Sequence, residues 1–208
     1  MTTILIADNH EVVRCGVQAL LAQRADWEVV AEAADGKEAV AQAIKTTPDV
    51  AIIDYSLPFL NGVEVTKQIR ERSPDTAVLI FTMHENNFVI RDSLRAGALG
   101  YVLKSDAQRL LVTAIDTVAQ HKPFFTGAAS AAALHAFQTR GSNGPLTARE
   151  RGVVQLIAEG HSNTKVASIL GLSLKTVETH RQKARDKLQL GSTAELVRYA
   201  VRNNIVDA

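Results

Sequence analysis

The first 120 residues alternate between two spacings of apolar positions. Short apolar runs with little polar interruption are typical of strands covered on both faces. Between them, apolar residues recur every three or four positions, which predicts helices. The predicted strands cover 4–8, 28–33, 50–54, 77–82 and 100–104, and the predicted helices cover 13–21, 36–45, 63–72, 87–96 and 107–120. Because parallel neighbours need crossover connections, this alternation predicts an α/β fold with a doubly wound, five-stranded parallel sheet.

The last sixty residues keep the helical spacing and lose the strand pattern. Capping boxes of the form Ser/Thr-x-x-Glu begin at Thr147 and Ser192 and predict the starts of a first and a last helix. Two further helices are predicted over 163–170 and 174–188, separated by a short turn that contains Gly171. This pattern predicts an all-α, four-helix domain of helix-turn-helix type.

The segment between these regions follows neither pattern. Its alanine-rich part, 127–137, is expected to form a short helix, and the turn formers TRGSNGP that follow predict a flexible boundary. We therefore expect domains at 1–120 and 146–208 joined by a linker at 121–145.

Charge follows the same division. Residues 1–144 hold 13 Lys and Arg against 16 Asp and Glu, whereas residues 145–208 hold 10 against 6. The net charges are therefore −3 and +4, so the first part is acidic and the second is basic enough to approach nucleic acid.

Several features limit the class of protein. The chain has no run of eighteen apolar residues and no basic-then-apolar leader, so we expect a cytoplasmic protein without a membrane span. Cys15 is the only cysteine, which excludes an internal disulfide, and its helical context favours a buried or half-buried side chain. The six histidines show no paired ligand spacing, and no zinc site is predicted.

Four polar residues stand where predicted strands end. They are Asp8, Asp54, Thr82 and Lys104. Alone, each has an ordinary explanation as a turn residue, a helix cap or a solvated lysine. The carboxyl ends of parallel strands share one edge of a sheet, where ligands collect. Together the four predict a site with two carboxylates, a hydroxyl and an ammonium group.

The segments ILIADNHEVVR, IIDYSLPFLNGVEV, LIFTMHE and GALGYVLKSD resemble the receiver domain of two-component response regulators, which has a flavodoxin-like fold. The resemblance covers about residues 1–120 and implies phosphorylation by a histidine kinase. It implies that Asp54 is the phosphoacceptor, Thr82 the switch hydroxyl, Lys104 the partner of the phosphate and Tyr101 an aromatic residue that reorients.

The resemblance also implies a Mg²⁺ site formed by Asp8, Asn9, Asp54 and the backbone carbonyl of Ser56. Such receivers usually carry two adjacent acids after the first strand, whereas here Asp8 is followed by Asn9. An amide oxygen brings no negative charge to a hard cation. We therefore expect weaker Mg²⁺ binding and slower phosphorylation than in an Asn9→Asp variant.

The helix predicted over 174–188 has one narrow apolar side that includes Leu174 and Val177. Its opposite side is polar, its flanks are basic and its net charge is +3. A polar centre with basic flanks suits the major groove, where the centre reads base edges and the flanks meet phosphates. A solvated polar face is the alternative.

The stretch LTARERGVVQLIAEGHSNTKVASILGLSLKTVETHRQKARDKL resembles the LuxR-type helix-turn-helix of NarL/FixJ response regulators. The resemblance implies binding to double-stranded DNA, and two-fold operators favour a homodimer. It implies that Glu178, Thr179 and Gln182 face bases and that Lys165, Lys175, Thr176 and Lys183 lie near phosphates.

These resemblances predict a DNA-binding response regulator that is phosphorylated on Asp54 and is not an enzyme. Two other classes stay open. A phosphatase with an aspartyl-phosphate intermediate usually needs a further acid where Ser56 stands. A regulator whose receiver serves as a dimerisation or inhibitory module, with little dependence on phosphate, is kept open by Asn9.

Overall fold

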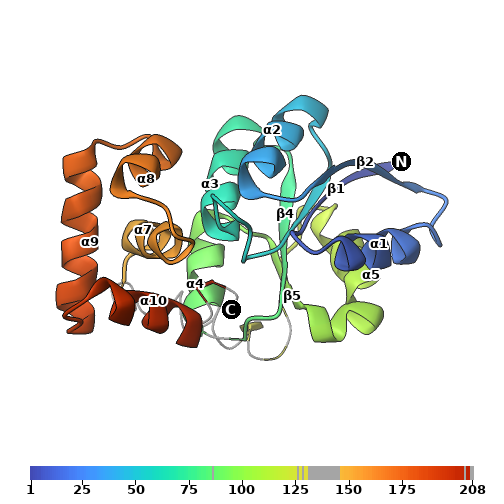
Figure 1. The fold of residues 1–208 in the computed structure, drawn as a ribbon. Helices are drawn as coiled ribbons and strands as arrows, with labels where there is room; N and C mark the ends of the chain where they lie inside the picture. The colour runs from blue at the N-terminus through green and yellow to red at the C-terminus, as the bar shows by residue number, and fades with distance from the viewer. Residues whose placement is uncertain (86, 126, 128, 131–145, 204, 207–208) are drawn as a thin grey trace. The chain divides into compact units, whose positions relative to one another are not determined.

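The computed structural model describes residues 1–85, 87–125, 127, 129–130, 146–203 and 205–206. The chain forms two compact units, 1–140 and 141–208, which are described separately (Figure 1). The helix expected over 127–137 lies mostly outside the described residues.

A parallel sheet forms the centre of the N-terminal unit. Its strands are β1 (Thr2–Ala7), β2 (Trp27–Ala33), β3 (Val50–Ile53), β4 (Ala77–Thr82), β5 (Gly100–Leu103) and β6 (Phe124–Phe125). They lie in the order β2-β1-β3-β4-β5-β6, and every neighbouring pair is parallel. The predicted parallel α/β fold is confirmed. The structure adds β6, whose two residues pair with Gly100 and Tyr101 and are too few to give a periodic signal.

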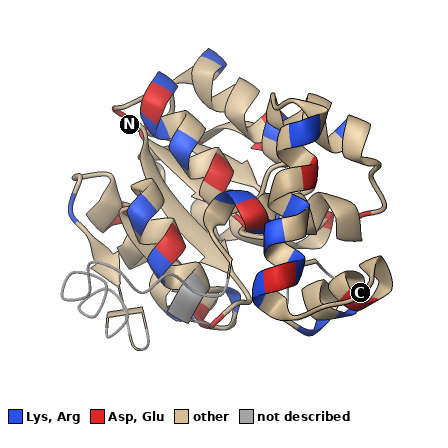
Figure 2. Cartoon of the chain, turned by 90° about the vertical axis from the view of Figure 1, so that its left-hand side faces the viewer, with Lys and Arg blue, Asp and Glu red and all other residues tan. Residues whose placement is uncertain are grey.

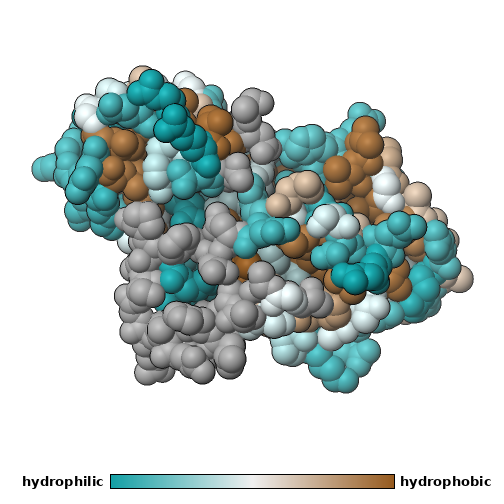
Figure 3. Space-filling model, turned by 90° about the horizontal axis from the view of Figure 1, so that it is seen from below, coloured by the Kyte–Doolittle hydropathy of each residue, from teal (hydrophilic) through white to brown (hydrophobic). Residues whose placement is uncertain are grey.

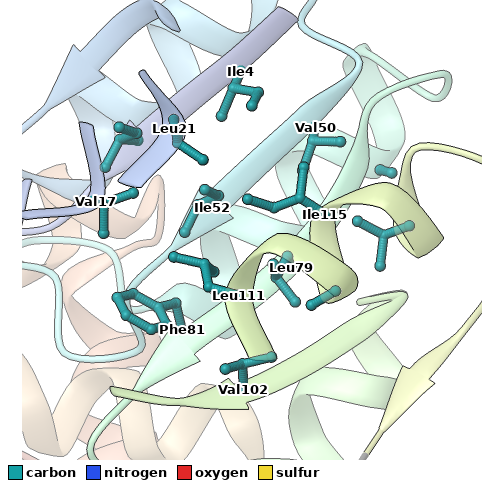
Figure 4. Packing of buried hydrophobic residues seen from close by; sticks show 14 of the residues in the cluster. Ile4, Val17, Leu21, Val50, Ile52, Leu79, Phe81, Val102, Leu111 and Ile115 are labelled. Carbon is teal, nitrogen blue, oxygen red and sulfur yellow. The ribbon is translucent and has the colours of Figure 1, made fainter. Parts of the chain in front are cut away.

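In the described part of this unit, five α-helices cover the sheet on both faces. The helices α1 (Glu11–Leu21) and α5 (Ala107–Val118) lie on one face, and α2 (Gly36–Thr46), α3 (Gly62–Arg72) and α4 (Asn87–Ala96) lie on the other (Figure 1). Every residue of β3 and β4 is buried, which explains why their sequences are continuously apolar. In Figure 4, Leu111 and Ile115 of α5 pack over Ile52 and Leu79 of the sheet.

One expectation about α1 is wrong. Cys15 is exposed, because α1 turns Val17 and Leu21 toward the sheet and leaves the opposite side in solvent. Val12, which shares that outer side, is 84% exposed. The helical pattern therefore gave the correct element but placed the cysteine on the wrong face.

The C-terminal unit contains four described helices: α7 (Ala148–Ala158), α8 (Asn163–Leu170), α9 (Leu174–Leu188) and α10 (Thr193–Arg202). Both predicted capping boxes form, at Thr147 and at Ser192. Gly171 ends α8 in a left-handed conformation with φ +64°, and Ser173 accepts the Thr176 N–H to begin α9. The predicted helix-turn-helix is confirmed.

The view from below shows a mostly hydrophilic surface on which hydrophobic residues are interrupted by polar ones (Figure 3). Within the described part of the chain, none of the helices has the length and apolar character needed to cross a membrane.

Candidate functional site

Two buried carboxylates meet at the carboxyl edge of the sheet. Asp8 and Asp54 directly follow β1 and β3, whose last residues Ala7 and Ile53 are paired. The Asp54 N–H donates to the Ala7 carbonyl at 2.8 Å, which fixes the end of β3 against β1. Asp8 and Asp54 are only 2% and 3% exposed. Carboxylates buried this deeply need positive charge beside them.

Lys104 supplies that charge. It follows β5 as the first residue of the 3₁₀ turn η1 (Lys104–Asp106). Its Nζ lies 2.6 Å from Oδ2 of Asp8 and 3.1 Å from Oδ2 of Asp54. The structure thus brings together Asp8, Asp54 and Lys104, three of the four residues expected at the strand ends. The two carboxylates, Asp8 and Asp54, are called the acidic cluster below.

The ionisation of Asp54 reflects these neighbours. Burial raises the pKa of the Asp54 carboxyl above its ordinary value, the Lys104 ammonium opposes this shift, and the negative charge of Asp8 adds to it. Ionised Asp54 therefore lacks some of the stabilisation that water gives an exposed carboxylate. A further cation beside the acidic cluster would supply part of it.

The turn after Asp54 is held close to it by Gly62. The Gly62 N–H donates to the Tyr55 carbonyl at 2.9 Å. A Cβ at position 62 would lie 2.7 Å from the Asp54 carbonyl oxygen and 2.9 Å from Tyr55 Cα, so the turn needs glycine. Asn61 begins α3 by accepting the Glu64 N–H at 3.1 Å.

Thr82 and Tyr101 are linked through His84. Thr82 ends β4, is fully buried, and its Oγ1 accepts the His84 N–H at a long 3.4 Å. The Tyr101 hydroxyl donates to the His84 carbonyl at 2.7 Å, and His84 Nε2 lies 2.7 Å from Ser56 Oγ. Burial raises the pKa of Tyr101, which keeps its hydroxyl protonated as a donor. Sequence reasoning missed His84, whose signal is its place two residues after Thr82.

The residues able to hold a metal ion differ partly from those expected. Among the described residues, ligand atoms of Asp8, His10 and Asp54 all lie within 4.8 Å of one another. Carboxylate oxygens and an imidazole nitrogen are ligands that suit a divalent cation. Asn9 lies in the loop after β1 and is exposed, and Ser56 is half-buried after β3. Sequence spacing missed His10, because its partner Asp54 is distant along the chain.

The loop that carries Asp8 to His10 is fixed from behind by Arg14. Arg14 Nη1 donates to the Asp8 carbonyl at 2.9 Å, and its Nε donates to Glu32 at 3.0 Å. The His10 N–H donates to Oδ1 of Asp8 at 2.9 Å. These bonds hold the Asp8 carboxylate in a fixed orientation.

The polar side of α9 is exposed as expected. Glu178, Thr179 and Gln182 are all exposed. The Thr179 hydroxyl donates to the Lys175 carbonyl at 2.8 Å, and Gln182 Nε2 donates to Asp186 at 2.7 Å. If Gln182 contacts a base, as the sequence predicts, its side chain must first release this hydrogen bond to Asp186.

The apolar side of α9 differs at one position. Val177 and Ala184 are buried, but Leu174 is 46% exposed. Leu174 is the first residue of the helix and is not covered by the core, so the helical angle alone placed it incorrectly.

The basic residues of α9 fall into two groups. Three are engaged within the unit: Arg181 bonds Asn163 and Thr193, Arg185 bonds the carbonyls of Leu190 and Gly191, and Lys187 lies 2.7 Å from Glu150. By contrast, Lys175 and Lys183 are exposed, as are Lys165 on α8 and, in part, Thr176. Basic and acidic positions alternate along the helices in Figure 2, so any attraction to phosphate comes from particular lysines rather than a uniformly basic face.

A parallel α/β unit with a lysine-neutralised acidic cluster, joined to a helix-turn-helix unit, defines a receiver coupled to a DNA-binding module. The comparisons with known proteins agree. Residues 4–116 match the response regulator receiver domain, and residues 144–200 match the bacterial regulatory proteins of the luxR family.

Full-length relatives share this organisation. Oxygen regulatory proteins NreC from Staphylococcus epidermidis and Staphylococcus carnosus are each 37% identical to the chain, over 98% of it and 99% of theirs. A structure of the response regulator RcsB from Salmonella typhimurium is 26% identical, covers 97% of this chain and 98% of that chain, and has a TM-score of 0.75. RcsB bound to promoter rprA in the presence of phosphomimetic BeF3⁻ has a TM-score of 0.71 at 26% identity, with 95% and 97% covered.

The chain belongs to the LuxR-type DNA-binding response regulators, in which a receiver domain controls transcription in response to phosphorylation. This family consists of transcription regulators and is not a class of enzymes.

Proposed function

We propose that this protein is cytoplasmic, that Asp54 accepts a phosphoryl group from a histidine kinase, and that the modified protein binds operator DNA as a homodimer. The observation that carries this proposal is the position of Asp54. Its carboxylate is 3% exposed at a strand end, beside Asp8 and 3.1 Å from the Lys104 ammonium.

This arrangement suits phosphoryl transfer. An Asp54 oxygen forms a bond to phosphorus while the bond from phosphorus to the kinase imidazole breaks. Asp8 and Asp54, with the Asn9 amide and the Ser56 carbonyl as further candidate oxygens, would hold Mg²⁺. When bound, the cation neutralises negative charge on the phosphoryl oxygens. Lys104 supplies a second positive charge and orients the Asp54 carboxylate.

The modified site would rearrange its neighbours. Phosphorylation adds oxygens and negative charge at Asp54, and Lys104 would move its ammonium toward them. The Thr82 hydroxyl, now in a long bond with the His84 N–H, would turn to the phosphoryl group. Since Tyr101 holds the His84 carbonyl, movement of this loop would change the Tyr101 contact as well.

DNA binding would use the exposed side of α9. RcsB, with the same organisation, has been solved bound to promoter DNA. Here Glu178, Thr179 and Gln182 would face base edges, while exposed Lys165, Lys175 and Lys183, with Thr176, would meet phosphates. A single four-helix module offers a small contact area, so pairing on a two-fold operator would raise affinity.

Intact mass measurement after incubation with acetyl phosphate and Mg²⁺ tests this proposal. We expect a phosphoryl adduct on the parent protein and none on Asp54→Asn. If the parent forms no adduct even with its cognate kinase, the receiver acts instead as a dimerisation or inhibitory module, the alternative that Asn9 keeps open.

A further inference from the structure

Leu174 is a large apolar side chain that the C-terminal unit leaves in solvent. It is the first residue of α9 and is 46% exposed. Of the residues that the structure describes, the other exposed large apolar side chains all lie in the N-terminal unit: Met1, Val12, Ile44 and Met83. Single exposed apolar residues are common on protein surfaces, so exposure alone gives Leu174 no role. The evidence for a role comes from its position on α9.

The packing of α9 depends on other residues. Val177 and Ala184 are fully buried on its apolar side. In the turn before the helix, Leu172 is half-buried, and its backbone N–H donates to the Ala167 carbonyl at 2.9 Å. A shorter side chain at position 174 would therefore leave α9 anchored to its unit.

The backbone at Leu174 is held by hydrogen bonds on either side of it. Ser173 Oγ accepts the Thr176 N–H at 3.1 Å and lies 2.8 Å from the Thr176 hydroxyl oxygen. The Val177 N–H donates to the Ser173 carbonyl at 3.1 Å. These bonds define the first turn of α9, so the Cα–Cβ bond of Leu174 points in one fixed direction.

Leu174 begins a row of exposed residues along α9. Residues four positions apart are neighbours on a helix surface, and Leu174, Glu178 and Gln182 follow this spacing and are all exposed. Around the helix axis, Glu178 lies about 40° and Gln182 about 80° from Leu174. Glu178 and Gln182 are two of the residues that would face base edges. Leu174 therefore extends that surface by one turn toward the N-terminal end of the helix.

This end of the helix is suited to a base contact. In helix-turn-helix proteins, the N-terminal residues of the second helix contact base edges in the major groove. A leucine side chain has no hydrogen-bond donor or acceptor, so it cannot pair with the polar groups of the bases. The apolar group that a base edge presents in the major groove is the C5-methyl group of thymine, and apolar side chains contact it.

We infer that Leu174 is a specificity-determining residue that packs against the C5-methyl group of a thymine in the operator. The inference rests on the proposed function, in which α9 enters the major groove, and adds a preference at one further base pair. Leu174 and Glu178 are separated by about 6 Å along the helix, whereas successive base pairs are about 3.4 Å apart. The thymine should therefore lie within about two base pairs of the base that Glu178 contacts.

Replacement of thymine by deoxyuridine tests this inference, because it removes the methyl group and leaves base pairing unchanged. Duplexes are first selected from random DNA by the full-length protein treated with acetyl phosphate and Mg²⁺. Each thymine of the selected site is then replaced singly, and binding is measured at several salt concentrations.

The test variant is Leu174→Ala, since alanine favours the helix and is too short to reach the methyl group. Leu174→Met is the conservative variant, because it keeps a long apolar side chain. The matched control is Ile44→Ala, which shortens a side chain that is 41% exposed on α2.

We expect one deoxyuridine replacement to lower the affinity of the parent about fourfold, the effect of burying one methyl group. Leu174→Ala should bind the thymine and deoxyuridine duplexes equally. Its salt dependence should match that of the parent, which shows that the variant is folded and contacts phosphates in the same way. Leu174→Met should retain part of the difference, and Ile44→Ala should retain all of it.

Three results would overturn the inference. They are a parent whose affinity no thymine replacement changes, a fourfold difference that persists in Leu174→Ala, and an equal loss of affinity for every sequence in Leu174→Ala. The last result would place the side chain against the sugar-phosphate backbone. In each case, salt-dependent binding of the parent to the selected duplexes still supports the proposed function. If the parent selects no DNA, the proposed function and the inference both fail.

Discussion

At the scale of single residues, the receiver site carries more negative than positive charge. Two nearly buried carboxylates share one ammonium, so ionised Asp54 has less positive charge around it than a fully paired acid. A bound cation would supply the missing positive charge, and without one the pKa of Asp54 is raised above its ordinary value. Substitutions that add or remove one charge here should therefore have measurable effects.

Asn9→Asp adds a carboxylate to the exposed loop after β1. We expect Mg²⁺ affinity to rise about tenfold, equivalent to about 1.4 kcal/mol, and phosphorylation by acetyl phosphate to become faster. Calorimetric titration with Mg²⁺ measures the affinity. Equal affinities for the parent and the variant would show that Asn9 does not limit the metal site.

The pH dependence of phosphorylation follows from the raised pKa of Asp54. Only the ionised carboxylate is a nucleophile, so the rate should fall on acidification with a midpoint above about 3.9, the ordinary value for Asp. Lys104→Met removes the ammonium that opposes the shift and should move the midpoint further upward. A pH–rate profile with acetyl phosphate checks both, and an unchanged or lower midpoint in Lys104→Met would contradict the assignment.

At the scale of elements, turns and helix pairs hold the functional side chains in position. The turn between β3 and α3 depends on the close approach of Gly62 to Asp54. In the C-terminal unit, Lys187 of α9 pairs with Glu150 of α7, so this basic residue helps to hold α9 against α7. Each feature gives a prediction about stability.

Gly62→Ala should destabilise the receiver by about 1–3 kcal/mol, since its Cβ would collide with backbone atoms of Asp54 and Tyr55. It should also slow phosphorylation. The control is Gly16→Ala in the middle of α1, where a Cβ meets nothing within 4 Å and alanine should stabilise by up to about 1 kcal/mol. Urea unfolding followed by Trp27 fluorescence measures both, and equal effects would reject the steric explanation.

Glu150→Gln should weaken the contact between α7 and α9. Burial opposes ionisation of Glu150, but Lys187 and Thr147 together lower its pKa below the ordinary value. Because the pKa of Glu150 is lower in the folded state than in the unfolded state, its ionisation stabilises the fold at pH values above about 4.3. This stabilisation is lost as the pH falls through the folded-state pKa.

We expect this substitution to cost about 1–3 kcal/mol near neutral pH and to reduce the acid sensitivity of α7, as measured by amide hydrogen exchange. Glu195→Gln, at the same capping-box position of α10 with backbone N–H groups as main partners, should have a smaller effect. Equal loss of protection in the two variants would show that Lys187 contributes little.

At the scale of the whole molecule, charge separates the two parts of the chain. Residues 1–144 carry a net charge of −3 and residues 145–208 carry +4. Attraction to DNA should therefore come from the C-terminal part and weaken with salt. Since Arg181, Arg185 and Lys187 are engaged within that unit, exposed lysines should carry most of the phosphate contacts on α9.

The double variant Lys175→Met/Lys183→Met should lower DNA affinity for all sequences and reduce the slope of log affinity against log salt by about 2. Gln182→Ala should instead change which sequences bind, with little effect on the slope. Binding at several salt concentrations to fragments selected from random DNA measures both. Lys45→Met, at an exposed position of α2, should leave the slope unchanged. A decrease in slope equal to that expected for one α9 lysine would reject the assignment.

The sequence predicted most of the fold because the local signals agreed with the tertiary structure. The strands β3 and β4 are buried on both faces, so their apolar runs were unambiguous. Thr147 and Ser192 fixed the starts of two helices through hydrogen bonds made within one turn. The meeting of Asp8, Asp54 and Lys104 followed from topology, since parallel strands share one edge.

The remaining details depended on contacts through space. His10 lies close to Asp54 and His84 lies close to Ser56, and no spacing along the chain reveals these two pairs. The exposure of Cys15 and Leu174 depended on how far the core extends beneath each helix. The two residues of β6 form a strand because β5 offers an edge, not because of their own pattern.

The hydrogen bond from Asp54 to Ala7 has a mechanical consequence. It ties Asp54, the proposed phosphoacceptor, to the end of β3, a strand that is paired on both sides and buried throughout. A force generated at this fixed point cannot be absorbed by bending β3. We therefore expect any displacement on phosphorylation to appear in the loops after β4 and β5, while the sheet stays in place.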